Sequence, residues 1–562
     1  MKAQRIIECV PNFSEGRNEL IIQAIASEIE RTEGVKLLHV DPGKSTNRTV
    51  ISFAGEPEAV IEAAFRAISM AAQKIDMRTH QGAHPRMGAT DVCPLIPISG
   101  ISMEETIGYA KKLAERVGAA LEIPVYLYEA SATVDARRNL ADIRSGEYEG
   151  FEEKMKLPEW QPDFGPVEFN QQAGATVIGA RDFLIAYNVN LNTKSVKLAN
   201  EIAFDIRENG RPVKDLITGK LVKNEAGEIV RSPGSCKALK AIGWYIEEYG
   251  LAQVSMNLTN MNETPLHIAF EACRKAAETY GLLVTGSELV GLVPKRALIE
   301  AGQYFLRKQQ RSLGISEKEC IQLAIQSLGL NALSTFDPQK RIIEYMLEEK
   351  STKLINLSLL DFAEETASES PAPGGGSVSA AVGAFGASLG AMVANLTAHK
   401  KGYEDQFEFF SETALQTQAK IAELLYLVDE DTKAFNAIID AFRLPKSSLE
   451  EKANRKKAIR KANLYAIEIP LKTMEVAASC VPYMKAMAER GNPNSISDAG
   501  VGAICIQAAV CGAGLNVQIN AAGLEDGDKK SKYLEKALKI ELETIAEVQK
   551  ILIYIKNSIQ TK

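Results

Sequence analysis

The pattern of hydrophobic and polar positions changes period repeatedly over the first 190 residues. Short apolar or alternating runs, typical of strands, occupy residues 5–10, 35–41, 48–54, 91–98 and 124–128. Between them, the segments 15–31, 56–77 and 102–121 repeat their apolar residues at the spacing of one helix face. The alternation of the two periods predicts an α/β subdomain, in which helices pack against a sheet.

The pattern continues beyond this region and then changes at about residue 330. Runs at 183–191, 252–258 and 282–286 suit strands, so a second α/β subdomain is expected, again a mixed sheet with helices. After residue 354 strand signals almost vanish, and long helical patterns are broken at 371–376, 444–448 and 491–497, which predicts an all-α helical bundle. The predicted organisation is therefore two α/β subdomains at 1–181 and 182–330, a linker at 331–353 and an all-α domain at 354–562.

Composition narrows the class of protein. A chain of 562 residues exceeds what one hydrophobic core supports, and its 46% hydrophobic and 24% charged residues argue against long disorder. The net charge of -7, without a basic cluster, argues against nucleic-acid binding. Eight scattered cysteines without a Cys-x-x-Cys pair read as reduced thiols, and no apolar signal-peptide run opens the sequence, so a cytoplasmic protein is expected.

One segment, 377–398, has about the length of a membrane span. It is dominated by Ala, Gly and Ser and lacks the long apolar side chains that favour insertion. A buried helix is therefore expected there, and no association with a membrane.

Two of the five histidines lie close together in the sequence, at His80 and His84. Their spacing resembles a metal-binding pair on a helix, but Gly82 and Pro85 disfavour a continuous helix, and no His-Glu-x-x-His motif is present. No metal is therefore expected. A loop histidine near Arg86 suits acid–base catalysis because imidazole titrates near neutral pH, although a single loop histidine is more often structural.

Polar turns follow two of the predicted strands, at 12–16 and 41–48. Open α/β sheets bind their ligands where strands end, so these turns are candidate parts of a site, with ordinary turn chemistry as the alternative. Asp41, Arg48 and Arg86 are candidates for substrate binding, since a guanidinium fork matches a carboxylate, and solvated surface charge is the competing interpretation.

Five motifs in order give the first half a specific resemblance. They are Glu8-Cys-Val-Pro-Asn-Phe-Ser-Glu-Gly16, Ser45-Thr-Asn-Arg-Thr49, His80-Gln-Gly-x-His-Pro-Arg-Met-Gly88, Pro124-Val-Tyr-Leu-Tyr128 and Gly174-Ala-Thr-x-x-Gly-Ala-Arg181. Together they resemble the glutamate formimidoyltransferase family over residues 5 to about 330. The resemblance implies that His84, before Pro-Arg-Met-Gly, is the general base. It also implies folate binding along Gly165, Pro166, Val167, Glu168, Phe169, Asn170, Gln171, Gln172, Ala173 and Gly174, where Gln171, Gln172 and Ala173 depart from the family pattern.

The residue types agree with the chemistry that this resemblance implies. N5 of tetrahydrofolate attacks the amidine carbon of N-formimidoyl-L-glutamate and sheds a proton, while the glutamate nitrogen gains one as it leaves. One histidine can serve both steps.

The second half carries two further candidate clusters. A glycine-rich turn, Ser370-Pro-Ala-Pro-Gly-Gly-Gly-Ser377, opens the Ala/Gly-rich helix and exposes backbone N–H groups, but it lacks the Gly-Lys-Ser/Thr end of a nucleotide-binding P-loop. The acidic run 429–431 lies within a helical pattern, where successive side chains point about 100° apart, so at least one faces the interior unless the run is a solvated acidic turn.

With Leu444-Pro-Lys446 and Gly491-Asn-Pro-Asn-Ser-x-Ser-Asp498, these clusters resemble the formimidoyltetrahydrofolate cyclodeaminase family, which is related to methenyltetrahydrofolate cyclohydrolases. That resemblance covers about 354–560 and implies that Asp431, the second aspartate of Asp-x-Asp, is catalytic. A carboxylate can relay protons and stabilise the cationic methenyl product.

Both families in this order resemble the bifunctional formimidoyltransferase-cyclodeaminase family of histidine degradation. The resemblance implies tetrahydrofolate as co-substrate, with or without a polyglutamate tail, N-formimidoyl-L-glutamate as donor, and a homo-oligomer. Two alternatives stay open at this point. In the first, the chain combines a glutamate formyltransferase with a methenyltetrahydrofolate cyclohydrolase. In the second, the helical half is a non-catalytic assembly module.

Overall fold

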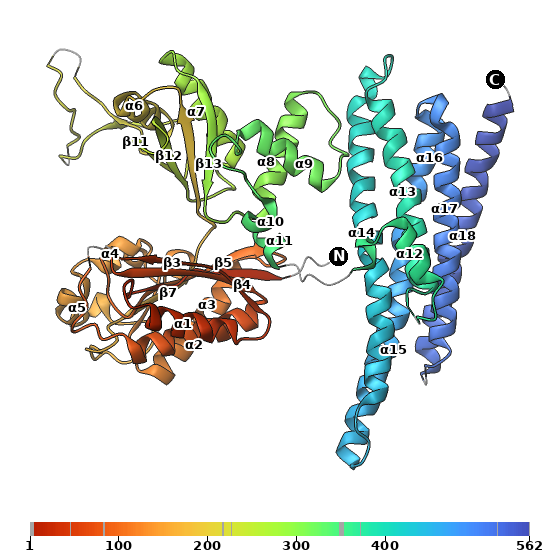
Figure 1. Ribbon diagram of the computed structural model, residues 1–562, viewed down its shortest axis with the longest axis horizontal. Helices are drawn as coiled ribbons and strands as arrows, with labels where there is room; N and C mark the ends of the chain where they lie inside the picture. Colours follow the sequence, from red (N-terminus) through yellow and green to blue (C-terminus); the bar gives the residue numbers. More distant parts are fainter. Residues whose placement is uncertain are drawn as a thin grey trace. The chain divides into compact units, whose positions relative to one another are not determined.

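A computed structural model of the chain describes residues 5–44, 46–82, 85–215, 218–225, 227–347, 353–370, 372–524 and 526–560 (Figure 1). The chain forms two compact units. The first comprises Met1–Ala301 and Ala324–Glu349, and the second comprises Gly302–Leu323 and Lys350–Lys562. The chain therefore passes three times between the units, after residues 301, 323 and 349.

A seven-stranded sheet forms the centre of the first subdomain. Its strands are β1 (Ile6–Cys9), β2 (Asn12–Phe13), β3 (Val35–Gly43), β4 (Arg48–Gly55), β5 (Thr90–Ser99), β6 (Val125–Leu127) and β7 (Thr176–Ala180). Their order is β1-β4-β2-β5-β7-β6, with β3 also paired to β4. Only the β5–β7 and β7–β6 pairs are parallel, so the sheet is mixed, as the sequence predicts.

Three amphipathic helices, α1 (Glu19–Glu30), α2 (Pro57–Lys74) and α3 (Met103–Leu121), cover one face of this sheet (Figure 1). Their starts follow from local chemistry: the Asn18 side chain caps α1, Pro57 occupies the first turn of α2, and Ser102 with Glu105 forms a capping box on α3. The short helices α4 (Leu140–Arg144) and α5 (Glu147–Met155) belong to a second apolar cluster, which includes Tyr126 and Phe151.

The second subdomain is built on a four-stranded antiparallel sheet. Its strands are β8 (Ile185–Leu191), β11 (Leu239–Ile246), β12 (Leu251–Leu258) and β13 (Val284–Val290), in the order β11-β12-β8-β13. The helices α6 (Val196–Ile206) and α7 (Leu266–Thr279) belong to it, as does the small hairpin β9 (Arg211–Pro212) and β10 (Arg231–Ser232). The stretch 331–353 contains the short helices α10 (Pro338–Arg341) and α11 (Ile343–Leu347), and Ile343 is buried against Ile6 and Ala54.

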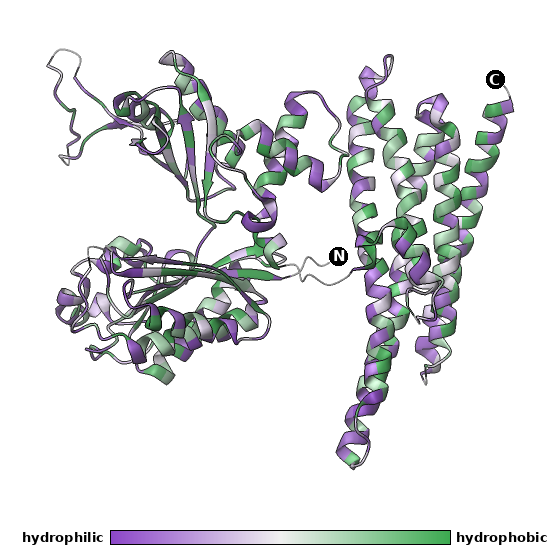
Figure 2. Cartoon of the chain, viewed as in Figure 1, coloured by the Kyte–Doolittle hydropathy of each residue, from purple (hydrophilic) through white to green (hydrophobic). Residues whose placement is uncertain are grey.

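Helices alone make up the described part of the second unit beyond residue 353, as the sequence predicts. They are α12 (Leu359–Thr366), α13 (Gly375–Ala398), α14 (Phe407–Arg443), α15 (Leu449–Ala478), α16 (Val481–Arg490), α17 (Ile496–Ala521) and α18 (Gly527–Gln560), with short 3-10 turns. The breaks predicted at 371–376, 444–448 and 491–497 coincide with junctions between these helices, except that α13 already begins at Gly375 and α17 at Ile496. Figure 2 shows the hydrophilic colour along the first half of α15, where charged residues are frequent, and mainly apolar colours along α13 and α17.

The helix α13 packs between α14 and α17. Gly383 and Gly386 face α17 at distances that leave little room for a side chain, so these glycines permit close helix packing, as predicted. Both α13 and the segment Pro493–Ala521 are long and apolar enough to cross a membrane, and 61% of the most apolar window of α13 is buried within the protein. The expected buried helix at 377–398 is therefore confirmed.

A segment from the middle of the chain also belongs to this unit. Between α8 (Lys295–Lys308) and α9 (Glu317–Leu328), the Ser312 hydroxyl donates to Asn395 Oδ1 at 2.6 Å, and Asn395 Nδ2 donates to the Gly314 carbonyl at 2.7 Å. The Ser312 and Leu313 N–H groups donate to His399 Nε2 and Ser411 Oγ at 3.2 and 3.1 Å. We call residues 312–314 the docking segment, because these bonds attach it to α13 and α14 and to the turn after α13.

Candidate functional sites

The two predicted polar turns of the first subdomain meet at one edge of the sheet. The Gly16 N–H donates to Asn47 Oδ1 at 3.0 Å, and Asn47 Nδ2 donates to the Gln81 carbonyl at 3.0 Å. Strands β1 and β3 both run antiparallel to β4, so their carboxyl ends reach the same edge. His84 itself lies outside the described residues, and its role stays a prediction.

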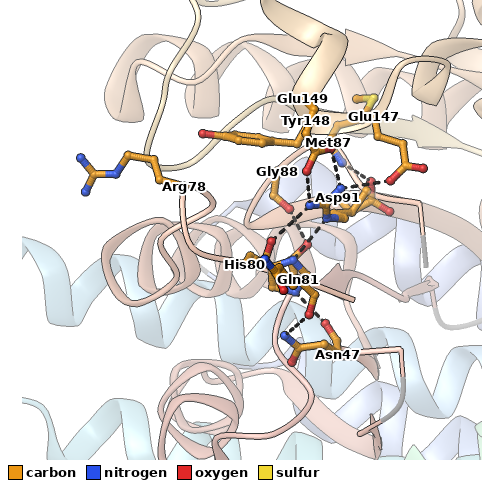
Figure 3. A network of polar contacts seen from close by, with 12 residues as sticks. Asn47, Arg78, His80, Gln81, Met87, Gly88, Asp91, Glu147, Tyr148 and Glu149 are labelled. Atoms are coloured by element: carbon orange, nitrogen blue, oxygen red, sulfur yellow. Dashed lines mark hydrogen bonds and ion pairs between the residues drawn. The ribbon is translucent and has the colours of Figure 1, made fainter. Parts of the chain in front are cut away.

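His80 lies in the described part of the loop that precedes His84 in the sequence. Its Nε2 lies 2.9 Å from the Asn47 carbonyl, and Arg86 Nε donates to its Nδ1 at 3.3 Å (Figure 3). A guanidinium only donates, so Nδ1 must accept and the proton sits on Nε2. Burial lowers the pKa of His80, the Asn47 carbonyl opposes this, and the Arg86 charge adds to the lowering. A neutral ring bonded at both nitrogens serves to position the loop.

Arg86 is buried and fully engaged. Its side chain bonds the ring and carbonyl of His80, and it pairs with Glu147 at 3.0 Å and with Glu149 at 2.6 Å. These contacts use all five N–H groups of the guanidinium. A pocket of about 460 Å³ borders it, lined by Gln81, Gly82, Arg86, Gly146, Glu147 and Glu149. A substrate carboxylate that bound Arg86 would have to displace a glutamate.

The other two candidates for substrate binding lie near each other. Arg48 begins β4 opposite Gly43, and Asp41 is exposed on the neighbouring β3. Burial lowers the pKa of the Arg48 guanidinium, while the carboxylates of Asp91 and Asp41 raise it. Asp91 is itself buried and paired with Arg144. Arg48 therefore faces carboxylates already, and among the described residues neither it nor Asp41 lines the pocket beside Arg86.

Half of the predicted folate segment lines one pocket of about 660 Å³. The members are Gly165, Pro166, Glu168, Phe169 and Asn170, and the end of α3 forms the opposite wall. The wall and the loop approach closely, because a Cβ on Gly118 would lie 2.5 Å from the Gly165 backbone nitrogen. Gly165 also has φ +84°, which favours glycine.

The rest of the segment has a structural role in the described chain. The Ala173 carbonyl accepts from the Ala89 N–H at 2.8 Å, and Gly174 bridges to Gly88. The Gln172 carbonyl accepts from Met77 N–H at 2.9 Å. These bonds attach the folate segment to Met77 and to Gly88 and Ala89, on either side of the loop that contains His80.

Asp163 anchors the turn that leads into the folate segment. Its carboxylate accepts from the Leu127 N–H at 2.8 Å, from the Thr133 hydroxyl at 2.6 Å and from Arg137 at 3.0 Å. The side chains of Arg137 and Asp163 are only 8% and 10% exposed. This buried ion pair fixes the turn from which the pocket-lining residues extend.

Asp431 is the candidate catalytic residue of the helical unit. It projects from α14 onto the first turn of α13, where the Ser377 hydroxyl donates to it at 3.2 Å. A Cβ on Gly376 would lie 2.1 Å from Asp431 Oδ1, so only glycine permits this approach. Burial raises the pKa of the Asp431 carboxyl, while the Ser377 hydroxyl and backbone N–H oppose the rise. A partly buried carboxyl with a raised pKa suits proton transfer.

The three consecutive acidic residues of α14 point to three different surroundings, as their helical spacing predicts. Asp429 accepts from the Leu354 N–H at 2.7 Å. Glu430 is buried, pairs with Lys433 at 2.7 Å and accepts from the Tyr465 hydroxyl. Only Asp431 of the three lines the pocket described next.

That pocket measures about 240 Å³ and is lined by both polar and apolar groups. Asp431 and Thr432 of α14 and the start of α13 contribute polar groups, and Phe435 and Ile438 of α14 contribute apolar side chains. Asn516 and Asn520 of α17 also line it, and sequence analysis missed them. Within the part of the chain that the structure describes, no group of three or more His, Cys, Asp or Glu side chains has the arrangement of a metal site.

Comparison with known proteins links these regions to three families. Residues 6–181 match the family described as Formiminotransferase domain, N-terminal subdomain, residues 186–348 match Formiminotransferase domain, and residues 358–539 match Formiminotransferase-cyclodeaminase. A formimidoyltransferase-cyclodeaminase of Dictyostelium discoideum is 43% identical over 555 residues, which is 98% of this chain and 99% of that protein. A glutamate formimidoyltransferase of Streptococcus pyogenes is 41% identical over 303 residues, 54% of this chain and 94% of its own. A methenyltetrahydrofolate cyclohydrolase of Methylorubrum extorquens is 37% identical over 183 residues, 32% of this chain and 88% of its own.

Proposed function

Because this chain belongs to the formimidoyltransferase-cyclodeaminase family, we propose that it catalyses two consecutive reactions on tetrahydrofolate. The first transfers the formimidoyl group from N-formimidoyl-L-glutamate to N5. The second closes the 5,10-methenyl bridge and releases ammonia. The observation that carries the proposal is the presence of one polar pocket in each unit, each bordered by a residue or loop that the family motifs identify.

In the transferase reaction, His84 is the proposed general base. It takes the proton that N5 loses on attacking the amidine carbon, and it returns a proton to the departing glutamate nitrogen. The contacts of His80, Arg86 and Asn47 support this assignment, because they hold the described residues that precede and follow His84 in the sequence. Tetrahydrofolate is proposed to bind in the pocket that Gly165 to Asn170 line. Arg48 and Arg86 are the proposed contacts for the substrate carboxylates, and each would exchange a carboxylate that it already faces for one of the substrate.

In the cyclodeaminase reaction, Asp431 is the proposed proton carrier. N10 attacks the formimidoyl carbon and loses a proton, the carbon–nitrogen bond to the formimidoyl nitrogen breaks, and that nitrogen leaves as ammonia. The Asp431 carboxylate accepts the first proton, and the resulting carboxyl, whose pKa is raised by burial, donates it to the leaving group. The negative charge of the carboxylate also stabilises the cationic product. The apolar wall at Phe435 offers a face for the pterin ring.

The test is a coupled assay with two variants of the full-length protein. Tetrahydrofolate and N-formimidoyl-L-glutamate are mixed with enzyme, and methenyl absorbance and ammonia are followed together. His84→Ala is expected to abolish transfer while tetrahydrofolate still binds. Asp431→Asn is expected to leave transfer intact and to stop both methenyl formation and ammonia release. Near-normal turnover of either variant in its own step would refute that assignment.

The similarity to a cyclohydrolase supports one alternative, a formyl transferase coupled to a methenyl hydrolase. The two are distinguished by the donor, because only formimidoylglutamate yields ammonia. A purely structural helical unit is the other alternative, and it predicts that Asp431→Asn has no effect on methenyl formation while the oligomer stays intact.

We further propose a cytoplasmic homo-oligomer that carries tetrahydrofolate with a polyglutamate tail and binds neither nucleic acid nor membranes. Exposed apolar side chains on α17 and α18 support self-association: Leu515 and Ile519 are 66% and 72% exposed, and Leu538 and Leu542 are 53% and 58% exposed. Light scattering of the purified protein tests the assembly. A monomer at micromolar concentration would contradict it.

A further inference from the structure

Two side-chain amides in the pocket beside Asp431 have no role in the reaction as described above. Asn516 and Asn520 lie one turn apart on α17, a helix in which apolar and small residues predominate. Polar side chains on such a helix are held by specific partners, and those partners decide which way each amide points.

A proline on the neighbouring helix fixes the orientation of Asn520. Pro470 lies inside α15 and has no N–H, so the Ala466 carbonyl one turn earlier lacks its usual helical donor. Asn520 Nδ2 donates to this carbonyl at 2.7 Å. Because a carbonyl oxygen only accepts, the amide atom of Asn520 that bonds it must be the nitrogen. Its Oδ1 is left as a hydrogen-bond acceptor.

Asn516 is oriented in the same way. Its Nδ2 donates to the Gly512 carbonyl at 2.9 Å. Its amide lies against the first residue of α13, where a Cβ on Gly375 would be 3.4 Å from Nδ2 and 3.8 Å from Oδ1. The next residue, Gly376, is the one against which Asp431 packs. Among the described residues, no hydrogen bond is made to the Oδ1 of Asn516 or of Asn520, so the pocket holds two acceptors in addition to the carboxylate.

We propose that Asn516, with Asn520 in support, accepts hydrogen bonds from the N–H groups of the formimidoyl substituent and thereby selects it over the formyl analogue. The inference rests on the cyclodeaminase function proposed for the same pocket. A protonated formimidoyl group carries two N–H donors on its terminal nitrogen, whereas a formyl group presents an oxygen, which only accepts. Acceptors of fixed orientation bind the first and leave the second without a partner.

The same contacts persist through the reaction. When N10 bonds to the formimidoyl carbon, its proton passes through Asp431 to the terminal nitrogen, and the bond from carbon to that nitrogen then breaks. The positive charge of the amidinium stays on the methenyl bridge, and the nitrogen departs as neutral ammonia. The terminal nitrogen gains an N–H during these steps, so an amide acceptor beside it binds more strongly as the bond breaks.

Two substitutions of Asn516 separate this role from a structural one. Asn516→Leu keeps the branching of the side chain and removes both the acceptor and the donor, whereas Asn516→Asp keeps an acceptor oxygen, loses the donation to Gly512 and adds a negative charge. For Asn516→Leu we expect kcat/KM for cyclodeamination of 5-formimidoyltetrahydrofolate to fall about 10- to 100-fold, the size of one hydrogen bond to a charged group. The inhibition constant of 5-formyltetrahydrofolate is expected to change less than about twofold, because formyl gains nothing from the amide oxygen.

Asn516→Asp is expected to retain at least about a tenth of the wild-type kcat/KM, because its oxygen still accepts. Gln518→Leu, an exposed change on the same helix, is the matched control and is expected to match the wild type. Equal losses in the Leu and Asp variants would overturn the inference, since both lose the bond to Gly512. A parallel weakening of 5-formyltetrahydrofolate would also overturn it, because that result indicates contact with the pterin ring. Failure of the wild-type protein to release ammonia, or full activity of Asp431→Asn, would instead refute the function on which the inference rests.

Discussion

Adding one methyl group at Gly376 tests whether the close contact between Gly376 and Asp431 is needed for cyclodeamination. In Gly376→Ala the added Cβ would lie 2.1 Å from Asp431 Oδ1 and 2.5 Å from its Cγ. Ordinary contacts of this kind exceed 3 Å, so the carboxylate or the first turn of α13 must move by about 1 Å. A displacement of that size near reacting groups costs about 10²-fold in rate. The overpacking itself costs about 1–3 kcal/mol of folding free energy.

The assay separates the two activities of the same protein. Transfer is followed with N-formimidoyl-L-glutamate as formation of 5-formimidoyltetrahydrofolate, and cyclodeamination is followed as methenyl absorbance from 5-formimidoyltetrahydrofolate. Gly376→Ala is expected to lower cyclodeamination about 100-fold. Transfer is expected to remain at the wild-type rate, because Gly376 belongs to the helical unit.

The neighbouring glycine supplies the matched control. In Gly375→Ala the new Cβ meets its nearest atom at 3.4 Å, an ordinary contact. Both substitutions raise helix propensity by up to about 1 kcal/mol. A change in helix stability alone would therefore affect both variants equally. Cyclodeamination by Gly376→Ala at the wild-type rate would refute the proposed contact between Gly376 and a catalytic Asp431.

Three further predictions concern buried groups. Burial raises the pKa of Glu8 from 4.5 to about 8, so the folded chain keeps a proton that the unfolded chain releases. Its contribution to stability is complete below pH 4.5 and is lost as pH rises toward about 8. Glu8→Gln should flatten the fall in melting temperature of the transferase unit across that window, and an unchanged slope would contradict the assignment. Arg137→Ala should lower the free energy of unfolding by about 3–5 kcal/mol, because Asp163 loses its buried partner. It should also raise KM for tetrahydrofolate. Wild-type values in calorimetry and kinetics would contradict the role of the Arg137–Asp163 ion pair as an anchor. Tyr465→Phe should destabilise the bundle by about 1.5–3 kcal/mol through the lost bond to Glu430, and an unaltered urea midpoint would argue against it.

The sequence predicted most elements whose pattern is local and strong. The strands at 5–10, 35–41, 48–54 and 91–98 and the three long helices between them appear within a few residues of their predicted bounds. Five of the described strands were not predicted: β2, β9 and β10, which span two residues each, and the longer strands β7 and β11. β7 spans only five residues and is buried throughout, so no alternation marks it. β11 is an edge strand with several exposed positions and an internal glycine, which weakens the pattern of a half-buried strand.

For the candidate sites too, local features could be predicted and contacts between distant parts of the chain could not. Motifs identified the acidic run on α14, and helical geometry required its three side chains to diverge. The sequence could not show which neighbour each one meets, because Leu354, Tyr465 and Ser377 lie far away along the chain. Asn516 and Asn520 were not predicted as site residues for the same reason. The sequence contains only an indirect indication of them: two amide side chains on the apolar helix α17, and a proline within α15, which packs against it.

The docking segment affects how the two activities can be separated in the laboratory. Residues 302–323 belong to the helical unit, yet they precede the last stretch of the transferase unit in the chain. A polypeptide that begins at residue 354 would therefore lack Ser312 and Gly314 and would expose Asn395 and Ser411 to water. The two units alternate along the chain. A separate helical unit would therefore need the docking segment supplied as a peptide, or substitutions of Asn395 and Ser411, whose hydrogen bonds that segment makes.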